Sequence, residues 1–192
     1  AGNCRLDRVA AAVERWFGGL STGEYRRTVA APTMHAGRLV DSKPTEQAHI
    51  CVVNEGVGVN SPHFYAMHLL TLILGGSSGS RLFQRIREEK GLAYSVYTYQ
   101  SAFTDCGLLT TYAGTGPSTA NEVVDSIAAE FESVLKDGIG KGELESARMQ
   151  SKGSLLLSLE SMSSRMSRLG KSEMTMGRPV TTRCRPGVIP GI

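Results

Sequence analysis

The sequence predicts an α+β domain in which an antiparallel-rich sheet has helices packed on one face. Two strand-like segments, 93–102 and 108–113, flank a turn at residues 103–107 that is typical of an antiparallel hairpin. A β-branched, apolar segment at residues 47–56 predicts a further strand. The other apolar segments repeat every three or four residues, as buried helical faces do, and they lie apart from the hairpin along the chain.

Composition excludes several classes of protein. Of 192 residues, 41% are hydrophobic and 20% are charged, which supports a globular core. A net charge of +3 is too small for a nucleic-acid-binding face. The most apolar segment, Leu69–Leu74, is far shorter than the ~20 residues that a membrane span requires. The four cysteines are widely scattered, which favours reduced thiols over a disulfide framework.

The N-terminal quarter of the chain predicts one helix and a connector. Residues 5–17 place Leu6, Val9, Val13 and the pair Trp16–Phe17 along one helical stripe. One short helix cannot bury such a stripe alone, so we expect it to pack on another element. Residues 20–46 are rich in Ser, Thr, Gly, Pro and charge, and they predict a connector to the first strand.

Helices are predicted on both sides of the hairpin. Before it, residues 62–74 and 81–90 predict two helices, the second ending at Gly91. After it, Pro117 opens a helix that ends near residues 137–138, because Pro is favoured at the first helical position. Residues 143–170 predict either one helix or two with a kink near Gly153.

Zinc-peptidase motifs are absent from the sequence. It contains no HExxH and no inverted HxxEH, and His63 and His68 lie five apart, off the spacing that pairs two imidazoles on a helix. No His–Asp pair can be assigned to any of its serines, so the serines do not indicate a hydrolase triad. We therefore expect no metal site made by this chain alone. The loop Gly75–Ser80 permits nucleotide binding as an alternative, but it lacks the Lys-Ser/Thr pair of a P-loop. A helix–helix turn in which Ser78 or Ser80 caps the next helix is the favoured interpretation.

The segment Arg81–Tyr99 is the most informative one. Arg87 lies in the last turn of its predicted helix, and Tyr94 lies at the start of the next strand, so the reversal at Gly91 can bring them together. A guanidinium and a phenol at such a corner offer several donors to a carbonyl oxygen. The chemistry alone leaves open an ordinary surface arginine and a core tyrosine.

The run LGGSSGSRLFQRIREEKGLAYSVYTYQSAFTDCGLLTTYAGT resembles the C-terminal domain of insulinase/pitrilysin-type peptidases, a family that includes mitochondrial processing peptidase. The resemblance extends through TEQAHICVV and KGSLLLSLESMSSRMSRLG, and so covers about residues 45–179. It implies that residues 1–28 are the tail of a preceding homologous domain and 29–46 a linker. Residues 47–179 would then form the peptidase domain, incomplete at its end, followed by an atypical tail at 180–192.

The resemblance implies one half of a two-lobed zinc metalloendopeptidase that cleaves extended peptides. In such peptidases an N-terminal lobe holds zinc on HxxEH and a distant glutamate, and the C-terminal lobe lends an arginine–tyrosine pair that supports the transition state. Matched residue by residue, that pair is Arg87 and Tyr94. The chain would then hold no catalytic residue and no metal, and would be inactive alone. Its expected partners are the zinc-bearing lobe, on the same or a separate chain, an extended peptide, and a second subunit in a homo- or heterodimer.

Two alternatives accompany this interpretation. The chain could be a non-catalytic interaction subunit, like the respiratory-complex core proteins that share this fold, although such a subunit has no need of the Arg87 and Tyr94 pair. Nucleotide binding at Gly75–Ser80 is the third hypothesis. The expected location is cytoplasmic, as for a bacterial enzyme, with a mitochondrial location as the alternative. We also expect the chain to be a fragment, because the resemblance ends near Pro179.

Overall fold

The computed structural model describes residues 3–21, 23, 30 and 32–180. The atypical tail from residue 181 onward, with Cys184, lies outside the described residues. The described residues divide into two compact units, one of residues up to 30 together with 155–180, and one of residues 32–154. The second unit contains the sheet.

The sheet has three antiparallel strands in the order β1-β3-β2. They are β1 (Ala48–Glu55), β2 (Ala93–Ala102) and β3 (Gly107–Thr115). β2 and β3 form the predicted hairpin, with Tyr97 opposite Tyr112, and β1 pairs with the other edge of β3. The predicted antiparallel sheet is therefore confirmed, and β3 is longer at both ends than the segment 108–113.

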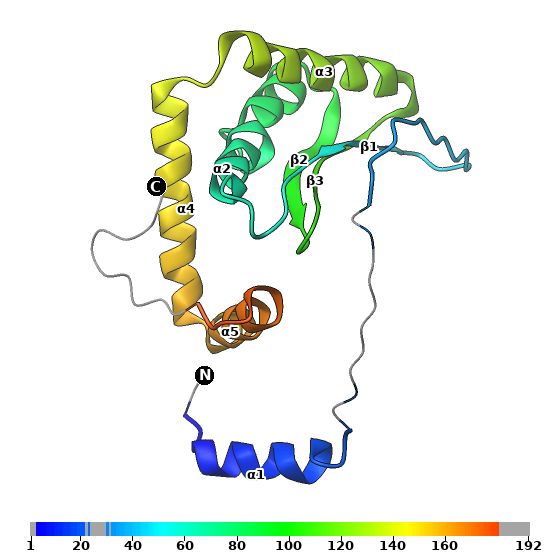
Figure 1. The fold of residues 1–192 in the computed structure, drawn as a ribbon. Helices are drawn as coiled ribbons and strands as arrows, with labels where there is room; N and C mark the ends of the chain where they lie inside the picture. The colour runs from blue at the N-terminus through cyan, green and yellow to red at the C-terminus, as the bar shows by residue number, and fades with distance from the viewer. Residues whose placement is uncertain (1–2, 22, 24–29, 31, 181–192) are drawn as a thin grey trace. The chain divides into compact units, whose positions relative to one another are not determined.

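Helices cover one face of this sheet, as the sequence predicts (Figure 1). The elements are α2 (Phe64–Gly75), η1 (Phe83–Glu89) and α3 (Ala120–Asp137), the last preceded by the short 3₁₀ turn η2 (Pro117–Thr119). Buried apolar side chains from all three helices and from β2 and β3 form one core: Leu74, Leu82, Ile86, Ala93, Val96, Leu109, Ala113, Val123 and Ile127. The α+β class is confirmed.

Three helices differ in detail from their prediction. The segment expected as an α-helix at 81–90 is mostly the π-helix η1, which Gly91 terminates with φ 61°. Pro117 opens a 3₁₀ turn, and the α-helix begins only at Ala120. α4 (Lys141–Glu160) runs through Gly153 without a break.

The break in the last helical region falls at Ser161 instead. Ser161 has an extended backbone, and its side chain accepts a hydrogen bond from the Ser164 backbone N–H at 3.3 Å, so it caps α5 (Met162–Met176). A serine that caps a new helix ends the preceding one, whereas a glycine inside a helix only weakens it. The alternative of a kink near Gly153 was therefore wrong in its position.

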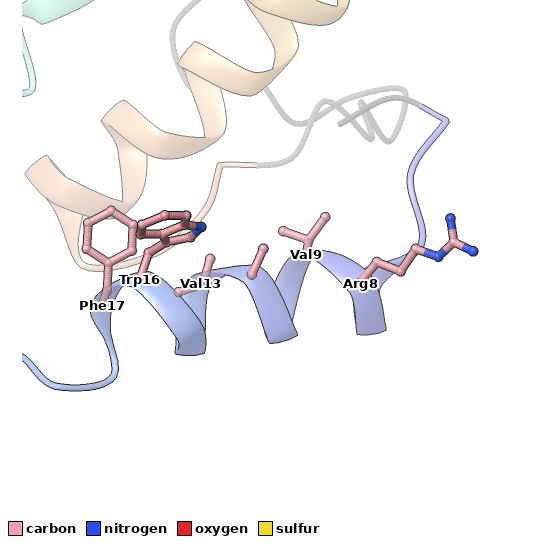
Figure 2. Close-up of a pocket in the computed structure, with 6 residues that line it drawn as sticks. Arg8, Val9, Val13, Trp16 and Phe17 are labelled. Atoms are coloured by element: carbon pink, nitrogen blue, oxygen red, sulfur yellow. The ribbon is translucent and has the colours of Figure 1, made fainter.

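The other unit contains α1 (Leu6–Phe17), which carries an apolar stripe. Figure 2 shows Val9, Val13, Trp16 and Phe17 on one side of this helix, where they line a shallow apolar hollow. No residue of α1 is buried, and Trp16 is 74% exposed. None of the helices among the described residues is both long and apolar enough to cross a bilayer.

Candidate functional site

Arg81, the first arginine of the segment Arg81–Tyr99, forms an ion pair with a glutamate of α4. Arg81 donates from its Nε to Glu143 Oε1 at 2.6 Å and from a terminal nitrogen to Glu143 Oε2 at 2.8 Å. The same guanidinium donates to the Gly138 carbonyl at 3.2 Å. The hydrogen bond from Arg81 lowers the pKa of Glu143, and the Gly140 backbone N–H adds to this effect; the same hydrogen bond raises the pKa of Arg81. Arg81 therefore fixes the start of η1 to α4.

Acid is expected to weaken this connection. The folded-state pKa of Glu143 lies below its ordinary value of 4.5, so its ionised form stabilises the fold above that pH. This stabilisation is lost as the pH falls through 4.5 and the lowered value. In urea unfolding at a series of pH values, Glu143→Gln should show a shallower loss of unfolding free energy below pH 4.5 than the parent chain. Glu55→Gln, at an exposed end of β1, is the matched control, and equal slopes in all three proteins would contradict the assignment.

The second arginine is engaged by α3. Arg85 donates from its Nε to Glu130 Oε1 at 2.8 Å, and the side chain of Glu130 is only 8% exposed. A buried carboxylate needs such a partner, because its desolvation is otherwise uncompensated. Arg81 and Arg85 are therefore structural residues that hold η1 against its neighbours.

Arg87 differs from both. Its side chain is exposed, and no carboxylate of the described residues lies within ion-pair distance of it. Its guanidinium carbon lies 4.8 Å from the centre of the Phe83 ring, one π-helical turn earlier, in a cation–π contact. This contact orients the guanidinium while leaving its N–H groups available to an external acceptor.

The turn at Gly91 connects η1 to β2, and Tyr94 lies at a β-bulge near the start of β2. After Gly91 the Leu92 backbone N–H donates to the Ile86 carbonyl at 2.9 Å, which holds the start of β2 to the buried part of η1. The β2–β3 register shifts between Ala93 and Ser95, so Tyr94 is the extra residue of a bulge. Bulges are frequent next to functional sites, where they re-aim a side chain. Tyr94 is 65% exposed, so it is no core tyrosine.

Arg87 and Tyr94 are therefore two exposed side chains on either side of one sharp reversal. The described hydrogen bonds include none between them. The side chains of Leu82 and Ile86 are fully buried and anchor η1, while Ala93 and Val96 anchor β2. Arg87 and Tyr94 are thus exposed side chains on two segments that the core anchors.

Aromatic side chains gather on the sheet face that the helices leave open. Tyr97 and Tyr112 are cross-strand neighbours with ring centres 4.9 Å apart, and Tyr99 lies 6.0 Å from Tyr97. His49 Nδ1 lies 2.8 Å from the Tyr112 hydroxyl in a hydrogen bond. Cys51 on β1 is opposite Tyr112. We call these five residues the tyrosine face.

Sequence patterns predicted only part of this site. Arg87 and Tyr94 follow from their segment, but the tyrosine face did not enter the prediction. Its signal is the alternation of Tyr97 and Tyr99 in a strand, which places both rings on one side. The contribution of Tyr112 and His49 depends on strand register, and these two residues are 63 apart in sequence.

The described residues do not fit a zinc site. No three His, Cys, Asp or Glu side chains among them come together as ligands would. His49 is engaged with Tyr112, and His68 lies partly buried on α2, where burial lowers its pKa. Structural zinc needs four ligands and catalytic zinc needs three, so the described part of this chain offers zinc no place.

The loop after α2 does not have the form of a phosphate-binding loop. A helix precedes it, whereas a P-loop follows a strand. Ser80 donates its hydroxyl to the Ser77 carbonyl at 2.6 Å, and neither Ser78 nor Ser80 caps η1 through its side chain. The loop is a turn between helices, as favoured from the sequence, although the predicted serine cap was wrong.

Fold and site together define an α+β domain that presents an exposed arginine–tyrosine corner and, in its described part, no metal ligands. Residues 1–151 match the peptidase M16 inactive domain, and the chain belongs to that family. A protein of Bacillus subtilis named as an uncharacterized zinc protease, YmxG, is 44% identical over 169 residues, which are 88% of this chain and 41% of that protein. The chain thus spans less than half the length of this relative.

Solved structures share the fold. A protease from Helicobacter pylori matches with a TM-score of 0.74 at 19% identity, covering 92% of this chain and 44% of that one. A chain of complex III from Candida albicans matches with a TM-score of 0.73 at 21% identity, covering 94% of this chain and 45% of that one. At these identities the likeness concerns the fold alone.

Proposed function

We propose that this chain is the substrate-binding, non-zinc-binding half of a zinc-dependent metalloendopeptidase that cleaves extended peptides, and that it is inactive alone. The observation that carries the proposal is the state of three arginines in one segment. Arg81 and Arg85 are paired with carboxylates, whereas Arg87 is exposed and has no carboxylate within ion-pair distance in the described part of the chain; Tyr94, at the bulge, follows it after Gly91. The zinc proteases among the relatives support the choice of reaction.

The proposed role of the pair is to hold a carbonyl group. Arg87 and Tyr94 would donate hydrogen bonds to the carbonyl oxygen of the peptide bond to be cut. That oxygen gains negative charge as the bond is attacked, so the donors bind the transition state more tightly than the substrate. Neither side chain can activate water. Zinc on another lobe would supply that step, since a bound zinc lowers the pKa of its water.

The exposed stripe of α1 supports a preceding lobe as the partner. Residues 1–28 would be the tail of a preceding homologous domain, 29–46 a linker, and 47–179 the peptidase domain. A stripe containing Trp16 and Phe17 on a helix without buried residues needs a docking partner. The zinc-bearing lobe, on the same or a separate chain, is the proposed partner, with an extended peptide as substrate.

Recombining the two halves tests this proposal. Neither this chain nor the isolated HxxEH-bearing lobe should cleave a quenched peptide, whereas the mixture with zinc should cleave it and a chelator should stop the reaction. Trp16 is the only tryptophan of the chain, so its emission should shift to the blue when α1 docks. Cleavage by the purified chain alone would contradict the proposal, as would an inactive mixture in which docking is seen.

A second candidate is an interaction subunit without peptidase activity. The likeness to a chain of complex III favours it as far as the fold goes. The exposed Arg87 and Tyr94 count against this alternative. An interaction subunit does not need exposed hydrogen-bond donors that take no part in the ion pairs that stabilise the fold. Under this alternative, replacing either residue would leave the activity of the recombined halves unchanged.

A further inference from the structure

The tyrosine face (His49, Cys51, Tyr97, Tyr99 and Tyr112) is continuous with the corner that carries Tyr94. Ser95 pairs with Gly114, and Tyr94 precedes it as the extra residue of the bulge. A Cβ atom at Gly114 would stand 3.1 Å from Ser95 Oγ and 3.2 Å from the Tyr112 hydroxyl. The Tyr112 ring therefore reaches over Gly114 toward the bulge, so the face begins beside Tyr94.

The chemistry of the face favours an uncharged, flat ligand group. Among the three strands the only acidic side chain is Glu55, at the far end opposite Leu108, and the only basic one is His49. The Tyr112 hydroxyl is already occupied by His49, so its ring is held in place. Tyr97 is 45% exposed and Tyr99 44% exposed, so ring surface remains open to a ligand.

We infer that the tyrosine face is a specificity subsite that takes an aromatic side chain of the bound peptide, close to the carbonyl held by Arg87 and Tyr94. This inference rests on the proposed function. An extended peptide sends alternate side chains to one side, so a carbonyl at the corner leaves a nearby side chain facing the rings. Aromatic groups stack favourably at ring separations like those between Tyr97, Tyr99 and Tyr112.

Other side chains fit this face less well. A lysine or arginine would gain a cation–π contact, but the only acidic residue of the three strands, Glu55, lies at the end away from the bulge, and the basic group would face the positive charge of Arg87. A small side chain would leave the rings in water. The expected order of preference is therefore aromatic, then basic, then small.

Peptide affinity tests this order directly on the full chain. The probes are fluorescently labelled Gly-Ser peptides that differ only in one central residue, which is Phe, Arg or Ala. Fluorescence anisotropy should show the Phe peptide binding about tenfold more tightly than the Ala peptide, the gain expected from one or two aromatic contacts. An Arg peptide that binds more tightly than the Phe peptide would overturn the inference.

Substitutions on the tyrosine face test whether these rings cause the preference for the Phe peptide. Tyr97→Leu and Tyr112→Leu should each reduce the Phe-to-Ala ratio toward one and leave the affinity for the Ala peptide unchanged. Tyr65→Leu is the matched control, since Tyr65 is 44% exposed but lies on α2, which covers the opposite face. A ratio that survives both substitutions, or that falls equally in Tyr65→Leu, would overturn the inference; circular dichroism confirms that each variant is folded.

Alkylation of Cys51 separates this inference from the proposed function. Cys51 is exposed on the tyrosine face, whereas Cys4 is exposed in the other unit and serves as internal control. Mass spectrometry should show that the Phe peptide slows alkylation of Cys51 and not of Cys4. Equal protection by the Phe and Ala peptides would overturn the aromatic preference alone. Absence of protection and of binding with every peptide would overturn the proposed function as well.

Discussion

Arg87→Ala is expected to lower kcat/KM of the recombined peptidase by about 10²–10³-fold, with both halves still associated. The guanidinium is exposed, is held over the Phe83 ring and has no carboxylate partner among the described residues. Its removal therefore takes a donor from the substrate and almost nothing from the fold. Initial rates with a quenched peptide, together with Trp16 emission as the measure of docking, give the comparison. Arg87→Lys should recover only part of the rate, because an ammonium lacks the planar fork of donors.

Arg85→Ala is the matched control on the same helix. Arg85 is turned toward Glu130, so its loss should leave kcat/KM nearly unchanged and lower stability by leaving a buried carboxylate without its partner. Tyr94→Phe removes only the hydroxyl and should resemble Arg87→Ala in rate. If Arg87→Ala and Tyr94→Phe both cleave as fast as the parent, the peptide is held elsewhere and the interaction-subunit alternative gains.

Local patterns predicted the sheet and its hairpin because the relevant interactions are close in sequence. The turn at 103–107 and the alternation in β2 specify strand pairing directly, and the structure confirms both. Likewise, the spacing of apolar residues predicted α1, α2 and α3. Helix boundaries were predicted less well where a capping serine such as Ser161 competes with a glycine such as Gly153.

Features that depend on tertiary packing could not be predicted in this way. The π-helix η1 and the bulge at Tyr94 follow from how Leu82, Ile86 and Ala93 enter one core, and single-residue patterns carry no signal for this. The ion pairs to Glu130 and Glu143 join residues 45 and 62 positions apart. The sequence and its family resemblance therefore singled out Arg87, whereas the carboxylate partners of Arg81 and Arg85 became known only from the structure.

Gly75→Ala is expected to destabilise the domain by about 2–3 kcal/mol, because it overpacks the contact between α2 and β2. A Cβ at Gly75 would stand 2.5 Å from Thr98 Oγ1 and closer still to the Thr98 backbone nitrogen. Thr98 cannot easily yield, since its hydroxyl is buried and lies 3.0 Å from the Thr111 hydroxyl in a hydrogen bond between β2 and β3. α2 would therefore have to withdraw from the sheet. Urea unfolding should show a lower midpoint with an unchanged slope.

Gly153→Ala is the control for the effect of alanine in a helix. Nothing lies within 4 Å of a Cβ at Gly153 in α4, so the same substitution should stabilise the chain by about 0.5–1 kcal/mol, through helix propensity alone. If the change in unfolding free energy has opposite signs at Gly75 and Gly153, the steric effect is separated from the effect of helix propensity. If Gly75→Ala also stabilised the chain, α2 would not lie against β2 as described. The core that anchors η1 and β2 would then need a different packing, and with it the corner that presents Arg87 and Tyr94.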